Sequence, residues 1–134
     1  MSREIKFRGR RKNGGSWIYG DLCRQELTTC IFPQDAYDSY NNYIVDESTV
    51  GQYTGLKDKN GVEIYEGDIV VLRNFRAVFV WYNTNRCSFE FREYVSDGGF
   101  VDSLKDFNID LYEVVGNIHD NPELINKEER LWHN

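Results

Sequence analysis

Short stretches in which apolar and polar residues alternate run along most of the chain, and this two-residue period is typical of half-buried strands. In residues 4–12, Ile5 and Phe7 stand between charged side chains, and residues 17–22 alternate in the same way. Residues 13–15 (Asn-Gly-Gly) separate the two stretches and suit a tight turn, because these residue types accept positive φ. We therefore predict an N-terminal β-hairpin.

The strand-like pattern continues beyond this hairpin to about residue 119. Pro33 ends the next apolar stretch, and residues 57–61 and 83–86 are rich in the residue types that favour turns. The strands predicted between these turns comprise residues 27–32, 50–56, 69–72, 77–82, 87–94 and 112–119.

The period changes after residue 120. Pro122 suits the first position of a helix, and Asp120 or Asn121 suits the capping position before it. Apolar residues then recur at the spacing of one helix face. We predict a short C-terminal α-helix over residues 121–133, whose apolar face comprises Leu124, Ile125, Leu131 and Trp132.

The composition also favours a folded, β-rich protein. Of the 134 residues, 40% are hydrophobic and 15% are aromatic, and so many large apolar groups offset the entropy of ordering the chain. The length is that of one ordinary domain. No apolar run approaches the roughly 20 residues that a transmembrane helix needs, and the first residues lack the apolar stretch of a secretion signal. We expect a soluble cytoplasmic protein.

Charge is unevenly distributed along the chain. The net charge is −6, yet the first 12 residues hold six cations against Glu4 alone, a local charge of +5 that leaves −11 for the rest. Because these cations alternate with Ile5 and Phe7, the pattern is typical of the solvent face of a strand. Contact with phosphate groups, or with the acidic surface of a second copy, is the alternative interpretation.

The sequence shows no pattern that predicts catalysis, a cofactor or a metal site. The three cysteines, Cys23, Cys30 and Cys87, lack the close pairs that zinc sites use. His119 and Asp120 are neighbours, and neighbours on a strand point to opposite faces. The glycines form no phosphate-binding motif. The residues singled out for interaction are cations and aromatic rings: Arg8, Arg10, Arg11, Trp17, Tyr19, Trp81 and Tyr82.

Three segments carry a resemblance to a known family. They are Ile5–Gly9 (IKFRG), Gln52–Val70 (QYTGLKDKNGVEIYEGDIV) and Glu113–Leu124 (EVVGNIHDNPEL). Together they resemble the YopX family of phage and prophage proteins, whose function is uncharacterised and for which no catalytic residues are established. The resemblance implies a small SH3-like barrel, and the corner at residues 66–68 (Glu-Gly-Asp) before a Val-rich strand is common in such barrels.

We thus expect a mainly β single domain over residues 1–134. Its parts are an N-terminal β region with the hairpin (1–48), an SH3-like barrel core (49–120) and the C-terminal helix (121–133).

The functional expectation is a non-enzymatic phage or prophage accessory protein in the host bacterial cell. It binds a protein partner of host or phage origin, or a second copy of itself, and no membrane. The alternative is a nucleic-acid-binding barrel that uses the basic strand at residues 3–12, although the net charge disfavours it. An enzyme using Glu66 or Asp68 is the third hypothesis, and its only support is the abundance of carboxylates.

Overall fold

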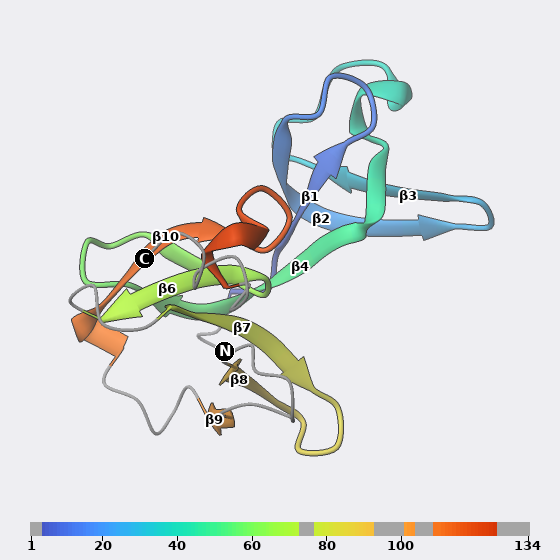
Figure 1. Cartoon of the computed structure of the whole chain (residues 1–134). Helices are drawn as coiled ribbons and strands as arrows, with labels where there is room; N and C mark the ends of the chain where they lie inside the picture. The colour runs from blue at the N-terminus through green and yellow to red at the C-terminus, as the bar shows by residue number, and fades with distance from the viewer. Residues whose placement is uncertain (1–3, 73–76, 93–100, 104–108, 126–134) are drawn as a thin grey trace. The chain divides into compact units, whose positions relative to one another are not determined.

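The computed structural model describes residues 4–72, 77–92, 101–103 and 109–125 (Figure 1). Their regular structure consists of strands in two antiparallel sheets and short 3-10 turns, which confirms the predicted mainly β class. The chain divides into two compact units, residues 1–55 and residues 56–134. The predicted single domain with a boundary at residue 48 stays a prediction.

The first unit contains a four-stranded part of one sheet, in the order β3-β2-β1-β4. Arg11 and Ser16 close the turn of the predicted N-terminal hairpin through a backbone hydrogen bond of 2.8 Å, and the hairpin is thereby confirmed. The strands are β1 (Phe7–Arg11), β2 (Trp17–Gln25), β3 (Thr28–Phe32) and β4 (Val45–Lys57), and a 3-10 turn, η1 (Tyr40–Tyr43), precedes β4.

The core of the first unit forms where β3 packs close to β1 and β4. Ile31 and Val45 are fully buried, and a Cβ atom added at Gly9 would lie 3.0 Å from Val45 Cβ and 3.1 Å from Ile31 Cδ1. The absence of a side chain at Gly9 therefore allows this close packing. An isolated antiparallel bridge also links Cys30 to Ile44.

β4 begins five residues before the predicted strand because it contains a large bulge. Arg8 of β1 pairs with Gly51, but Arg10 pairs with Asp46, so β4 holds extra residues between these two pairs. Three of the four residues between these pairs, Glu47, Ser48 and Thr49, are polar, and sequence patterns assign such residues to loops.

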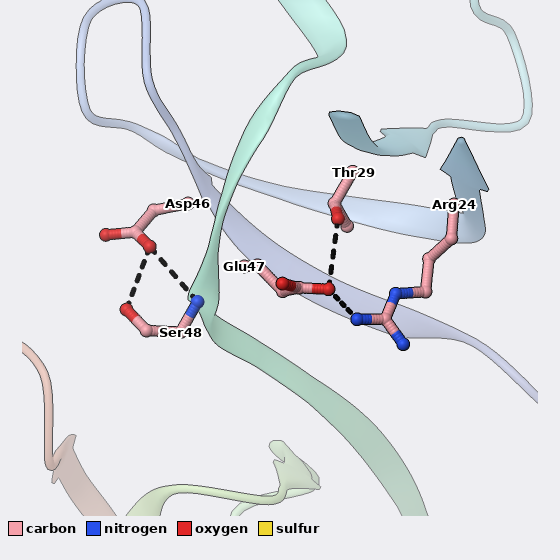
Figure 2. A network of polar contacts seen from close by, with 5 residues as sticks. All are labelled: Arg24, Thr29, Asp46, Glu47 and Ser48. Carbon is pink, nitrogen blue, oxygen red and sulfur yellow. Dashed lines mark hydrogen bonds and ion pairs between the residues drawn. The ribbon is translucent and has the colours of Figure 1, made fainter. Parts of the chain in front are cut away.

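Side chains hold this bulge in place (Figure 2). The backbone N–H of Ser48 and its hydroxyl group both donate to Asp46 Oδ1, at 3.0 and 2.8 Å. Thr49 Oγ1 accepts a hydrogen bond from the backbone of Arg10 and donates to the Asp46 carbonyl. The bulge is thus a defined feature of the fold.

The second unit carries the other sheet, in the order β10-β6-β7-β8-β9. Its core is a cluster of buried side chains: Ile64, Val70, Val78, Val80, Phe91 and Tyr112. The predicted strand at residues 69–72 is confirmed, and Ile69 and Val70 in it are fully buried. The predicted hairpin from residue 77 is confirmed as far as residue 92, and residues 93–94 lie outside the described residues. The strands are β6 (Asp68–Leu72), β7 (Ala77–Asn83), β8 (Ser88–Arg92), β9 (Val101–Ser103) and β10 (Tyr112–Asn117), while β5 (Glu63–Tyr65) lies next to β4.

Two parts of the predicted fold differ from the structure. Both sheets have free ends and the described strands form no closed barrel, so the SH3-like barrel is not confirmed. Within the predicted C-terminal helix, Pro122–Leu124 forms a single 3-10 turn, η4, and Asn121 makes no side-chain capping bond. The rest of that helix, residues 126–133, lies outside the described residues.

Candidate interaction surface

The buried acidic side chains of the second unit bind the chain itself. Asp58 is 5% exposed; its Oδ1 accepts from the N–H of Asn60 and Val62 at 2.8 and 2.9 Å, and its Oδ2 from that of Val114 at 2.9 Å. Burial opposes ionisation, but the backbone donors of Val114, Val62 and Asn60 together lower the pKa of Asp58 below its ordinary value. Asp58 thus holds its own turn and β10 together, and we call these three hydrogen bonds the Asp58 clamp.

Two other buried carboxylates also accept hydrogen bonds from neighbouring groups of the chain. Asp68 Oδ2 accepts from the N–H of Tyr65 at 2.7 Å, which closes the corner before β6. Glu90 is 0% exposed, and its two carboxylate oxygens accept from Asn83 Nδ2 and Ser88 Oγ, each at 3.1 Å. The fold therefore provides a structural role for both carboxylates.

The segment of residues 113–124 is also held by its own side chains. Asn121 Oδ1 accepts from the N–H of Asn117, and Asn117 Oδ1 accepts from the N–H groups of His119 and Asp120. A Cβ atom added at Gly116 would collide with Asn121 Oδ1. Asn117 and Asn121, which belong to the third segment with a family resemblance, thus hold the end of β10 in place.

Four of the seven residues predicted for interaction share one face of the first unit. Arg8 pairs with Tyr19 and Arg10 with Trp17 across β1 and β2, and directly paired residues point to the same face. The guanidinium carbons of Arg8 and Arg10 lie 4.8 and 5.3 Å from the centre of the Trp17 ring. Arg8 is 5% exposed, whereas Tyr19 is 47% exposed. We call these four residues the arginine–aromatic face.

Arg11 does not belong to this face, because it follows Arg10 on the strand and points to the opposite side. Its Nε donates to Ser16 Oγ at 2.8 Å, and its Nη1 lies 3.4 Å from the carbonyl oxygen of Asn42. Arg11 thus braces the hairpin turn against the segment before β4.

The predicted residues of the second unit are separated from each other. Trp81 and Tyr82 are consecutive in β7 and so point to opposite faces of their sheet. The guanidinium carbon of Arg92 lies 4.8 Å from the centre of the Trp81 ring, and Tyr82 packs edge-on against Phe89 at 5.0 Å. Packing accounts for both rings.

A depression that the sequence did not predict lies beside Tyr19. It has a volume of about 490 Å³. Ile5, on its wall, is 50% exposed, and a Cβ atom at Gly20 would collide with the carbonyl oxygen of Phe32. Periodicity gives no signal for it, because it depends on where two strands stop pairing. Its lining comprises Glu4, Ile5, Lys6, Tyr19, Gly20, Asp21, Phe32, Pro33 and Gln34.

A second depression, of about 330 Å³, lies near the tip of the β2–β3 hairpin. In its wall Glu47 Oε1 forms an ion pair with Arg24 and accepts a hydrogen bond of 3.3 Å from Thr29 Oγ1 (Figure 2). Both ion-pair side chains are more than half exposed, and exposed ion pairs contribute little to stability. This depression is polar, and Leu27 at its rim is 97% exposed.

In the described part of the chain, no three His, Cys, Asp or Glu side chains gather as a metal site requires. The same residues contain no helix with the length and hydropathy needed to cross a bilayer.

Comparison with known proteins places the chain in a family. The family model described as YopX protein matches residues 6–126, nearly the whole chain. The chain belongs to the YopX family. A similar solved structure is that of protein EF1440 from Enterococcus faecalis, with 26% identity, a TM-score of 0.44 and coverage of 93% of this chain and 100% of that one. No curated protein matches the sequence.

Proposed function

We propose that this YopX-family protein is a non-enzymatic interaction module that binds a protein partner through its first unit. The arginine–aromatic face carries the proposal. Tyrosine, tryptophan and arginine are the residues most enriched at the energetic centres of protein interfaces. Here Tyr19 is half exposed, and two guanidinium groups already lie against Trp17. Groups fixed before binding lose less conformational entropy on association.

The carboxylates support the non-enzymatic part of the proposal. Among the described residues of the second unit, Asp58, Asp68 and Glu90 are the buried acids, and each accepts hydrogen bonds from neighbouring backbone or side chains. A general acid or base needs a proton-transfer partner in the substrate, and these groups have structural partners instead. A role as a phage or prophage accessory protein in the host cytoplasm completes the proposal and rests on the family.

Nucleic acid is the weaker candidate partner. The net charge of −6 repels phosphate at long range. Of the cations in the basic strand, Arg8 is buried and Arg11 is bonded to the hairpin turn. The described arginines of the strand thus already make contacts within the chain, Arg8 and Arg10 with Trp17 and Arg11 with Ser16.

The test is a pull-down from host cells with the tagged full-length protein, divided into nuclease-treated and untreated halves. We expect a protein partner that survives nuclease, is lost with Tyr19→Ala and Arg10→Ala, and is retained by Tyr37→Ala. Tyr37 is the matched control because it is an almost fully exposed tyrosine outside the face. Light scattering of the same variants shows whether the partner is a second copy. Equal capture by all variants, or capture that nuclease abolishes, would overturn the proposal.

A further inference from the structure

In the first unit, the two halves of β2 pair with different strands, the first half with β1 and the second half with β3. Its pairing with β1 runs from Trp17 to Gly20, where Gly20 lies opposite Phe7. From Asp21 to Gln25, β2 pairs with β3 alone. Among the described residues, no strand is paired with the other side of this second half.

The register shows which backbone groups face this open side. The carbonyl oxygen of Lys6 accepts from the N–H of Tyr53, 2.9 Å away in β4. Backbone groups of successive strand residues point to alternate sides, so those of Phe7 point towards β2, where Gly20 lies opposite. Those of Leu22, two residues after Gly20, point to the same side, where β1 is no longer present.

The side chains beside this open side are apolar, aromatic and acidic. The depression of about 490 Å³ lies where β1 and β2 separate, and Ile5 and Tyr19 on its wall are about half exposed. Asp21, on the same face of β2 as Tyr19, is exposed. Glu4 is paired with Lys6 at 3.5 Å. A basic group thus complements both Asp21 and the net charge of the protein.

We propose that an extended segment of the partner protein is added as a strand along the open side of β2, with a basic residue opposite Asp21. This inference rests on the proposed function. A residue opposite Leu22 would exchange both backbone hydrogen bonds with it. A lysine or arginine opposite Asp21 would share its face, form an opposite-charge pair and lie diagonally across from the Tyr19 ring.

The probe is a random library of twelve-residue peptides, selected on the full-length protein. We expect enriched peptides in which a basic residue stands between β-branched or apolar ones. The selected peptide is then resynthesised with one N-methyl group at each position in turn, which removes one backbone donor without changing the protein. Binding should fall by about tenfold or more at alternate positions only, because only every second N–H faces β2.

The contact with Asp21 is tested by charge reversal. Asp21→Lys should weaken binding of the selected peptide by about tenfold or more. Asp110→Lys, at an exposed aspartate of the second unit, should leave the affinity unchanged. Failure to enrich peptides, a uniform N-methyl profile, or equal effects of the two substitutions would overturn the inference. If the pull-down still gives a partner that depends on Tyr19, the proposed function stands and strand addition alone is wrong.

Discussion

Asp58 Oδ2 accepts a hydrogen bond of 2.9 Å from the backbone N–H of Val114, which lies 56 positions further along the chain. The neighbouring N–H of Lys59 donates to the carbonyl oxygen of Tyr112 at 3.0 Å. β10 is an end strand of its sheet, and these two bonds satisfy groups on its outer side. Exposed strand edges invite pairing with other chains, so the turn at Asp58 protects this edge.

The clamp predicts a large stability loss on replacing Asp58. Asp58→Ala leaves three backbone donors in a buried site without their acceptor, and we expect a loss of about 3 kcal/mol in the free energy of unfolding. Urea unfolding followed by tryptophan fluorescence measures this. Glu113→Ala, at a half-exposed carboxylate on β10, is the control and should cost less than about 0.5 kcal/mol. Equal losses would contradict the clamp.

The same carboxylate predicts an acid dependence. Because the folded-state pKa of Asp58 is lowered, its contribution is fully present above the unfolded-state pKa of about 3.9. It is lost as pH falls through the lower folded-state value. The difference in unfolding free energy between wild type and Asp58→Asn should therefore be constant near neutral pH and shrink below about pH 4. A difference that grows in acid would show that the sign is wrong.

A close backbone approach predicts the effect of a side chain at Gly20. A Cβ atom there would collide with the carbonyl oxygen of Phe32 and lie 2.9 Å from Pro33 Cα. Gly20→Ala should cost about 2 kcal/mol or more, since either β2 or the end of β3 must shift. Gly15→Ala is the comparison because its Cβ atom would meet nothing within 4 Å, and only its positive φ adds about 1 kcal/mol. Thermal unfolding of both variants decides this.

Local signals in the sequence predicted most strands correctly. The hairpin of β7 and β8 was found because regular alternation flanks a turn rich in asparagine. The bulge in β4 was missed because Asp46, Ser48 and Thr49 are residues typical of loops. They remain in the strand through bonds to one another and to Arg10, and pattern analysis does not record such bonds.

The sequence predicted only part of the candidate surface, again because local patterns do not record contacts between distant residues. Alternation placed Arg8 and Arg10 on one side of a strand, and the predicted hairpin brought Trp17 and Tyr19 near them. The depression depends on the register ending at Phe7 and Gly20, which no local pattern specifies. Likewise, Asp58 was seen only as part of a turn, because its partner Val114 lies in a distant segment.

Phe91 and Leu27 are both large apolar side chains, but they differ in burial. Phe91 is fully buried in the core of the second unit, while Leu27 at the hairpin tip is 97% exposed. Phe91→Ala should therefore cost about 3–5 kcal/mol, and Leu27→Ala less than about 0.5 kcal/mol. Urea midpoints of the two variants measure the difference. A Leu27→Ala loss as large as that of Phe91→Ala would contradict the described burial.

The limited accessibility of the basic strand predicts that the protein binds nucleic acid weakly. Because Arg8 is buried against Trp17 and Arg11 is bonded to Ser16, we expect a dissociation constant above about 10⁻⁴ M for single- and double-stranded oligonucleotides at physiological salt. Arg8→Gln should lower stability by about 1 kcal/mol through loss of the ring contact without changing this affinity. Fluorescence anisotropy between 50 and 200 mM salt checks it. Tight binding that weakens steeply with salt and disappears in Arg8→Gln would instead assign the basic strand to phosphate recognition.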